Sequence, residues 1–160
     1  MKVLITGTAK GIGKAIAEEF LNLGHDVVGM DILPSAVKSE RYTHFAADIL
    51  NDELPDISGV EILINNAGVQ NSGQDIDVNL KATIRVTEKY GFGDAIKSIL
   101  FIASASGSTG SEFPEYAASK GGVIAYMKNT ALRASKSGVT VNSLSPGGVL
   151  TSSNDHVIND

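Results

Sequence analysis

Short runs of β-branched and aliphatic residues alternate with longer helical patterns along the chain. Such alternation is typical of βαβ units, whose largely parallel sheet is buried on both faces. We therefore expect an α/β fold in which helices cover a doubly wound parallel sheet in three layers. The pattern predicts strands at residues 2–6, 26–30, 42–46, 60–64, 98–103 and 140–144, and helices at 11–23, 76–90 and 115–135.

The composition fits a single soluble globular domain over residues 1–160, of which 42% are hydrophobic. A net charge of −5 and the lack of a basic run argue against a nucleic-acid partner. No apolar stretch is long enough for a bilayer and no signal peptide is visible, so no membrane partner is expected. The chain has no cysteine, which fits the cytoplasm, and its three scattered histidines predict no metal site.

A glycine-rich segment, Thr-Gly-Thr-Ala-Lys-Gly-Ile-Gly, follows the first predicted strand and opens the first predicted helix. Its missing side chains would let the chain turn tightly and let a pyrophosphate approach the amides at the helix start. The spacing differs from the common G-x-G-x-x-G pattern. It resembles the TGxxxGxG motif of the short-chain dehydrogenase/reductase (SDR) family, which consists of NAD(P)-binding Rossmann-type oxidoreductases. A turn that binds no nucleotide is the alternative. The expected cofactor-binding residues are Gly7, Lys10, Gly11, Ile12 and Gly13.

Asp31 stands at the end of the second predicted strand, where a carboxylate can accept hydrogen bonds from the adenosine ribose hydroxyls. The same charge would repel a 2′-phosphate, so NAD is favoured over NADP. Lys10 in the glycine turn argues the other way, because a cation there could face that phosphate. The alternatives are a strand-end carboxylate that caps the next turn and a solvated loop cation.

Two further segments resemble the family at predicted strand ends. Asp48 resembles the family aspartate that contacts the adenine amino group, with Ile49 beside the ring, although an N-cap is the alternative. The sequence Asn-Asn-Ala-Gly at residues 65–68 matches the NNAG motif. This resemblance implies that the cofactor passes close to small residues while the Asn side chains tie strand ends together. The implied binding residues are Asn66, Ala67 and Gly68.

Tyr116 and Lys120 are four residues apart in a predicted helix, so their side chains share one helix face. A nearby cation favours the phenolate form, which suits general acid–base chemistry near neutral pH. An ordinary amphipathic helix explains the pair equally well when it is considered alone. Ser104 lies upstream in a Ser- and Gly-rich stretch, residues 104–111, which is expected to form a loop at the carboxyl end of a strand.

The SDR catalytic pattern maps to Ser104, Tyr116, Lys120 and Asn79. The resemblance implies that Tyr116 transfers the proton at the substrate oxygen and that Ser104 hydrogen-bonds this oxygen. Lys120 would hold the nicotinamide ribose and acidify the tyrosine, and Asn79 would position water in a proton relay. Ser106 is the rival of Ser104, which is preferred because its distance from Gly107 matches the family spacing. The interval to Tyr116 is slightly short for the family.

The segment after the sixth predicted strand resembles the family's N-x-x-x-PGxxxT pattern. Pro146 and Gly147 would shape the nicotinamide pocket, and Val149 and Thr151 would contact its carboxamide face. Relatives have a longer segment than residues 68–79 and continue well past Thr151. We therefore expect the C-terminal part of the family fold, with most of the substrate pocket, to be missing. The chain would be a fragment of a longer product or, alternatively, a reduced domain.

The leading functional hypothesis is an NAD-dependent alcohol dehydrogenase or ketone reductase, which interconverts an alcohol and a ketone or aldehyde by hydride transfer. One alternative is a non-catalytic or regulatory nucleotide-binding module, and another is a nucleotide-sugar epimerase or dehydratase with a similar Tyr-Lys pair. The family resemblance also implies a homodimer or homotetramer. In this family the Tyr-bearing helix pairs between subunits, which makes Tyr126, Met127 and Leu132 candidate contacts, and core positions are the alternative for all three.

Overall fold

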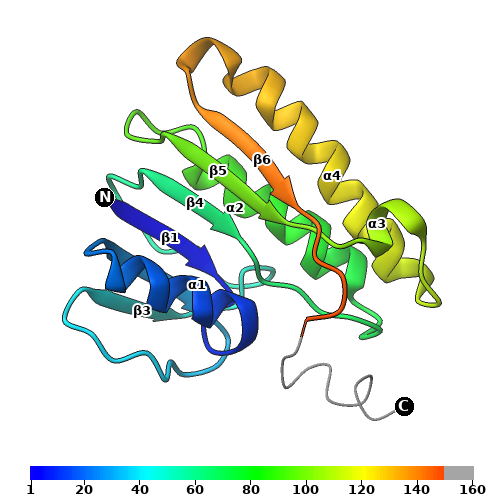
Figure 1. The fold of residues 1–160 in the computed structure, drawn as a ribbon, viewed down its shortest axis with the longest axis horizontal. Coiled ribbons are helices and arrows are strands. Elements are labelled where there is room, and N and C mark those ends of the chain that lie inside the picture. Colours follow the sequence, from blue (N-terminus) through cyan, green and yellow to red (C-terminus); the bar gives the residue numbers. More distant parts are fainter. Residues whose placement is uncertain (150–160) are drawn as a thin grey trace.

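The fold is a six-stranded parallel sheet, described for residues 1–149 by a computed structural model (Figure 1). All six predicted strands are confirmed, with small shifts in their ends. The first, third and sixth begin and end where the sequence predicts, and β4 begins two residues later than expected. The strands are β1 (Lys2–Thr6), β2 (Asp26–Asp31), β3 (Tyr42–Ala46), β4 (Ile62–Asn65), β5 (Ser98–Ile102) and β6 (Thr140–Leu144).

The strand order β3-β2-β1-β4-β5-β6 reverses direction at β1. Thr6 of β1 pairs with Met30 of β2, while Ile5 pairs with Ile64 of β4 on the other side. The chain leaves β1 and β4 toward opposite faces of the sheet, which opens a crevice at their carboxyl ends. This crevice is where an open α/β sheet places its ligand.

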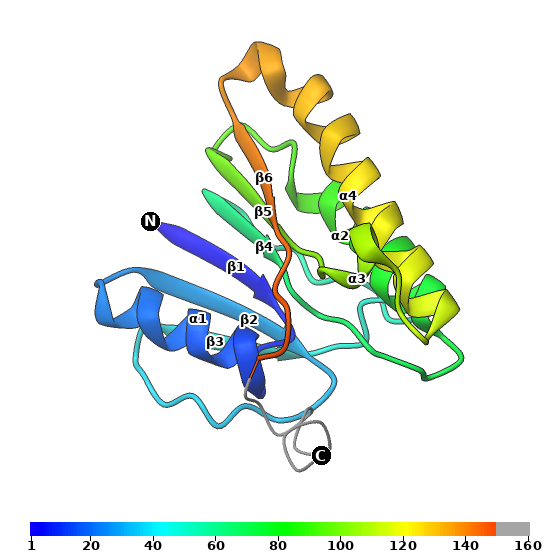
Figure 2. The same cartoon turned by 45° about the vertical axis from the view of Figure 1, so that its right-hand side comes forward.

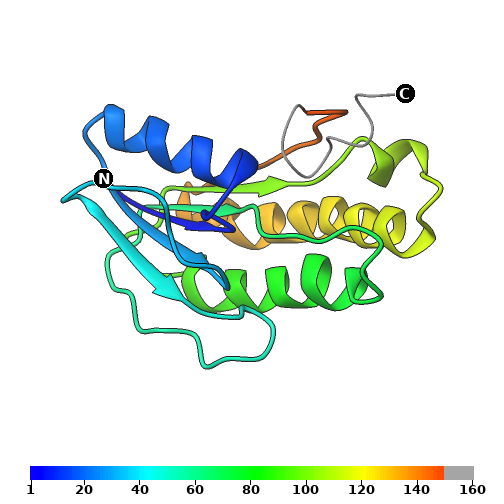
Figure 3. The ribbon, with the colours of Figure 1, turned by 90° about the horizontal axis from the view of Figure 1, so that it is seen from below.

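Helices lie on both faces of the sheet (Figure 3). One face carries α1 (Gly11–Asn22), which ends before Gly24 at φ +85°, and the other carries α2 (Thr83–Tyr90) and α4 (Pro114–Ala134). The predicted helix at 76–90 is only partly α-helical, because its first seven residues form a π-helix, η1 (Ile76–Ala82). The predicted loop at 104–111 contains a short helix, α3 (Ser106–Thr109), and α4 is followed by a 3₁₀ turn, η2 (Ser135–Ser137).

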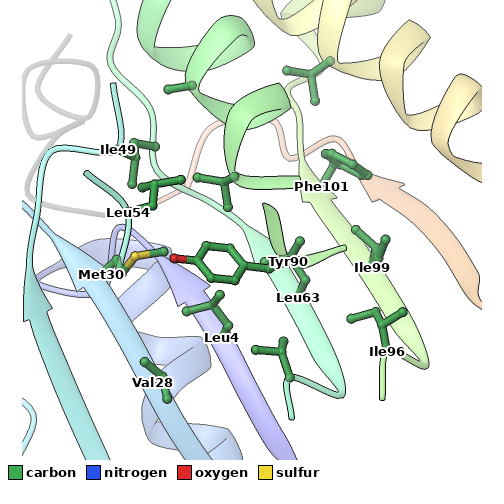
Figure 4. Packing of buried hydrophobic residues seen from close by; sticks show 14 of the residues in the cluster. Leu4, Val28, Met30, Ile49, Leu54, Leu63, Tyr90, Ile96, Ile99 and Phe101 are labelled. Atoms are coloured by element: carbon green, nitrogen blue, oxygen red, sulfur yellow. The ribbon is translucent and has the colours of Figure 1, made fainter. Parts of the chain in front are cut away.

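The main hydrophobic core lies between the sheet and the helices α2 and α4. Leu63 and Phe101 are fully buried there, and Figure 4 shows them with Tyr90 of α2 among the strand side chains. The Tyr90 hydroxyl donates to the Pro55 carbonyl at 2.6 Å, so its polar end is satisfied where the connection from β3 to β4 crosses this face. That connection and the one from β2 to β3 contain no helix.

A polar cluster joins the exposed sides of α2 and α4. Glu88 accepts hydrogen bonds from Arg133 at 2.6 and 2.8 Å and from the Tyr126 hydroxyl at 2.7 Å. The Arg133 hydrogen bonds hold the pKa of Glu88 down at about 2. Arg133 also lies over the Phe92 ring, 4.2 Å from its centroid. Because both partners are over two-fifths exposed, this cluster fixes the angle of the two helices more than it stabilises the fold.

The opposite face has less cover, because α1 is the only helix on it among the described residues (Figure 2). An apolar groove of about 800 Å³ runs between α1 and strands β4 to β6. Its walls include Phe20 of α1, Leu23 directly after α1 and Leu144 of β6, and it reaches Gly11 and Val149 near the carboxyl edge of the sheet. No helix within residues 1–149 is long and apolar enough to cross a membrane.

Candidate active site

The glycine-rich turn connects β1 to α1 at the crevice. Gly7 and Gly11 have φ values of +76° and +57°, a region that other residues rarely adopt. Gly13 is buried so closely that a Cβ atom would lie 2.0 Å from the Gly7 carbonyl oxygen. No side chain caps the start of α1, and its first turn carries no acidic residue. Its first backbone N–H groups and dipole are therefore oriented to receive an anion.

A set of four hydrogen bonds joins the ends of β1 and β4. The Thr6 hydroxyl oxygen accepts from the backbone N–H groups of Asn66 and Ala67, each at 3.0 Å. The Asn66 side-chain amide donates to the carbonyls of Thr6 and Gly7 at 3.0 and 3.1 Å. The NNAG segment thus ties the strand ends together, as its resemblance to the family motif implied, and fixes the glycine turn beside it.

Asp31 lies at the end of β2, next to the glycine turn. Its two carboxylate oxygens accept from the backbone N–H groups of Ala9 and Leu33, each at 2.9 Å. A carboxylate offers about four acceptor positions, so lone pairs remain for further donors such as ribose hydroxyls. Lys10 is exposed at the start of α1, and no side-chain hydrogen bond from it caps that helix.

Asp48 makes local hydrogen bonds after β3. Its oxygens accept from the Leu50 backbone N–H and the Asn51 side chain, each at 2.8 Å. The Leu50 hydrogen bond is the main cause that lowers the pKa of this carboxyl. Asp48 therefore caps a turn, and no helix begins there as the N-cap alternative expected. Ile49 is 6% exposed and packs in the core, so its contact with an adenine ring stays a prediction.

Asn79 lies in the π-helix η1, and single π turns are frequent at functional sites. Its side-chain amide donates to the Val69 carbonyl and the Ser119 hydroxyl, each at 2.9 Å, and its oxygen accepts from the Val69 N–H at 2.7 Å. Both amide protons are therefore in use. A relay water at this side chain has to donate to the amide oxygen.

Tyr116 and Lys120 lie in the first half of α4, which begins at Pro114, a residue that suits the first helical turn. The Lys120 ammonium nitrogen lies 5.9 Å from the centre of the Tyr116 ring and donates to the Ile102 carbonyl at 3.0 Å. Burial lowers the pKa of Lys120 to about 8. Lys120 is only 6% exposed, yet at this pKa its ammonium is still charged for the most part at pH 7.

Ser104 lies just after β5 and is 8% exposed. Its hydroxyl oxygen accepts from the Ser106 N–H at 3.2 Å, at the start of α3. A Cβ atom on Gly107 would lie 2.7 Å from the Lys120 carbonyl carbon, so this glycine lets α3 approach α4 closely. The Ser104 turn is thereby held against the helix that carries Tyr116 and Lys120.

The segment after β6 lies beside this turn, because the Ala105 N–H donates to the Pro146 carbonyl at 2.9 Å. Gly147 follows, and Val149 is one of the residues that line the apolar groove. Thr151 lies outside the described residues. Gly68 completes the site from the β4 side, since a Cβ atom there would lie 3.3 Å from the Lys120 nitrogen and 3.0 Å from the Asn79 amide oxygen.

Two contributors to the site were not identified from the sequence. The Ile102 carbonyl holds the Lys120 ammonium, and the Ser119 hydroxyl links Asn79 to the Tyr116 carbonyl, which accepts from it at 2.7 Å. A backbone carbonyl leaves no trace in a sequence. Ser119 could have been identified from the sequence, because a small hydroxyl residue next to Lys120 on the buried side of a helix needs a polar partner.

The fold and this arrangement define a dinucleotide-type α/β domain with a Ser-Tyr-Lys-Asn set at its crevice. A family model described as "short chain dehydrogenase" matches residues 40–160. The chain belongs to the short-chain dehydrogenase/reductase family.

Known relatives agree with this assignment. The 3-oxoacyl-acyl-carrier-protein reductase FabG of Vibrio cholerae is 30% identical over 178 positions, covering 92% of this chain and 73% of the relative. The D-beta-hydroxybutyrate dehydrogenase of Rhizobium meliloti is 34% identical, covering 92% and 71%. A solved structure of 4-hydroxyisoleucine dehydrogenase complexed with NADH has a TM-score of 0.82 at 27% identity, covering 98% of this chain and 79% of that one. The first alignment exceeds the 160 residues of this chain, so the relative has internal residues that this chain lacks.

Lys120→Met should stabilise the cofactor-free protein at pH 7 by roughly 1–3 kcal/mol, because each unit by which burial lowers the lysine pKa costs about 1.4 kcal/mol. The folded pKa of about 8 lies below the ordinary 10.5, so the unfolded chain binds more protons between these values. Wild-type stability therefore rises across this pH window, and the advantage of the variant should shrink there. Urea unfolding at pH 7 and pH 9.5 measures both effects. Lys128→Met, at an exposed position of the same helix, is the control. A variant that is less stable than wild type at pH 7 would refute this account.

Proposed function

We propose that this chain is an NAD-dependent oxidoreductase that interconverts an alcohol and a ketone or aldehyde. The observation that carries the proposal is the placement of Tyr116 beside the Lys120 ammonium on α4, with the Ser104 turn held against the same helix. This set lies at the carboxyl edge of the sheet, on the same edge as the glycine turn. Membership of an oxidoreductase family supports the same reaction class.

The residues present fit a nicotinamide dinucleotide. The uncapped start of α1 offers N–H donors for a pyrophosphate, and Asp31 offers acceptors for ribose hydroxyls. Lys120 offers a charged donor for a second ribose beside the bare backbone of Gly68. When bound, the nicotinamide ring would supply or accept the hydride, a chemistry that no side chain provides.

Tyr116 is the general acid and base in this proposal. In reduction its hydroxyl gives a proton to the substrate oxygen, and in oxidation it takes the proton back. Lys120 places a charge that is shielded from water beside the Tyr116 ring. Ser104 donates a hydrogen bond to the same substrate oxygen. Asn79 binds Val69, the residue directly after the NNAG segment, and Ser119 of α4, so it connects this segment to the helix that carries Tyr116 and Lys120.

Asp31 supports NAD over NADP, because its carboxylate would repel a 2′-phosphate near the ribose. The names of two relatives specify 3-oxoacyl and beta-hydroxybutyrate compounds, so β-hydroxy and β-keto acids are the first substrates to test. The chain spans about three-quarters of the length of these relatives, and the substrate-covering part of the pocket is not described here. The cysteine-free sequence supports a cytoplasmic location.

Tyr116→Phe should lower turnover at least ~100-fold, the lower range for losing a general acid–base group. Binding of NADH should stay within about twofold of wild type, because the phenyl ring keeps the shape of the site. Absorbance of NADH with a panel of β-keto acids and other ketones measures turnover, and fluorescence titration measures binding. Tyr126→Phe on the same helix, which loses a hydroxyl bonded to Glu88, is the matched control. Near-wild-type turnover of the Tyr116 variant would exclude the mechanism, and a wild type that binds NADH without turnover would favour a non-catalytic module.

Asp31→Asn should shift cofactor preference toward NADPH by roughly tenfold, the effect of removing one charge a few ångströms from a phosphate. The variant keeps the size of the side chain, and its one amide oxygen can accept from only one of the two backbone N–H groups, those of Ala9 and Leu33, that bind Asp31. Dissociation constants for NADH and NADPH provide the ratio. Asp26→Asn, at the exposed start of the same strand, is the control. An unchanged ratio would show that Asp31 does not face the 2′ position.

We also propose that the chain forms a homodimer or homotetramer through the outer face of α4. Leu132 is 76% exposed on that helix, and Phe92 is 39% exposed beside Arg133 at the end of α2. Sedimentation velocity should therefore show a species larger than the monomer, and Leu132→Glu should shift it toward the monomer. A wild type that sediments as a monomer at micromolar concentration would contradict this proposal.

A further inference from the structure

A chain of three hydrogen bonds runs from the glycine turn, across β3, to the segment after β2. The Thr8 hydroxyl lies 2.8 Å from the Tyr42 hydroxyl, which lies 3.0 Å from Nδ1 of His44. Nε2 of His44 lies 2.9 Å from the Leu33 carbonyl. The Tyr42 and His44 rings are stacked, with centroids 6.0 Å apart and planes at 28°. Two side chains of one strand, Tyr42 and His44, therefore bridge the glycine turn and the segment after β2.

The direction of each hydrogen bond follows from chemistry. The Leu33 carbonyl can only accept, so Nε2 of His44 carries a proton. In a neutral imidazole, Nδ1 then accepts from the Tyr42 hydroxyl, whose oxygen accepts from the Thr8 hydroxyl. Every donor in the chain has one acceptor. Thr8 is fully buried, so its hydroxyl depends on this partner for its hydrogen bond.

Gly29 of β2 makes room for the two hydroxyl groups. A Cβ atom at this position would lie 2.1 Å from the Tyr42 hydroxyl oxygen and 2.4 Å from the Thr8 hydroxyl oxygen. Gly29 is also the register partner of His44 in the sheet. The sequence thus combines a glycine in β2 with a tyrosine and a histidine in β3, and this combination allows the bridge to form.

Asp31 forms a second bridge between the same two loops. Its oxygens accept from the N–H groups of Ala9 and Leu33, one in the glycine turn and one in the segment after β2. Leu33 is therefore held at its N–H by Asp31 and at its carbonyl by His44. The glycine turn is held at two consecutive residues, Thr8 and Ala9. Two bridges fix both the separation and the relative rotation of the loops, whereas one would leave a hinge.

We propose that Tyr42 and His44 are positioning residues, which hold the two walls of the adenosine end of the cofactor site in their binding geometry through Thr8 and Leu33. This inference rests on the proposed function, because the walls in question are the glycine turn and the segment beside Asp31. Asp31 supplies the charge that recognises the ribose, and the Tyr42–His44 bridge supplies the rigidity. A site held in its bound geometry loses less entropy when it binds its ligand, and so it binds more tightly.

Tyr42→Phe removes one hydroxyl, breaks the bridge in the middle and keeps the ring. It should raise the dissociation constant of NADH by roughly 3- to 10-fold, the range for one net hydrogen bond. ADP, which carries only the adenosine end and both phosphates, should lose the same factor. Turnover at saturating NADH should not change, because Tyr116 lies at the other end of the site. Fluorescence and calorimetric titrations measure binding, with Tyr90→Phe as a buried control that loses its hydrogen bond to Pro55.

A double variant separates positioning from general destabilisation. Tyr42→Phe combined with His44→Leu should weaken NADH binding no more than the stronger single change, because both break one bridge. Thr8→Val breaks the same bridge from the turn side and replaces Tyr42→Phe if that variant does not fold. Unchanged NADH affinity in Tyr42→Phe, or equal weakening in Tyr90→Phe, would overturn this inference alone. A wild type that binds no NADH would overturn the proposed function as well.

Discussion

The site depends on the junction between the ends of β1 and β4. Four hydrogen bonds join Thr6 and Gly7 to Asn66 and Ala67 there, and Gly13 packs against the same junction because it has no side chain. The junction sits at the point where the strand order reverses, so it fixes the glycine turn against the NNAG segment. Gly68, at the end of the NNAG segment, lies against Asn79 and Lys120, and the backbone of Lys120 lies against the turn that follows Ser104. Each later part of the site is placed by the one before it.

The site also depends on the buried ammonium of Lys120. Burial of a lysine disfavours its charged form, which is why its pKa falls to about 8, and in the described structure the Ile102 carbonyl is its hydrogen-bond partner. The free-energy cost of burying this charge arises at the place where a charge beside Tyr116 is chemically useful. Strained or destabilising features of this kind concentrate at functional sites.

The fold could be predicted from the sequence almost completely, because strand runs and glycine turns are local signals. The strands at 2–6, 42–46 and 140–144 were predicted to the residue. The π-helix η1 could not be predicted, since Asn79 needs its partners Val69 and Ser119 from outside its own helix to stabilise a wider turn. The Tyr42–His44 bridge could not be predicted for the same reason, because it joins two residues of β3 to two loops elsewhere in the sequence. Candidate site residues followed from motifs, whereas their partners required three-dimensional contacts.

A crystal structure of the chain with NADH would test the central claim most directly. We expect the pyrophosphate at the amides of residues 11–13, the adenosine ribose hydroxyls on Asp31 and the nicotinamide ribose on the Lys120 ammonium. We also expect the Tyr116 hydroxyl and the Ser104 hydroxyl to face the same side of the nicotinamide ring. A cofactor bound elsewhere, or one that leaves Lys120 on the Ile102 carbonyl with Tyr116 turned away from the ring, would contradict the account.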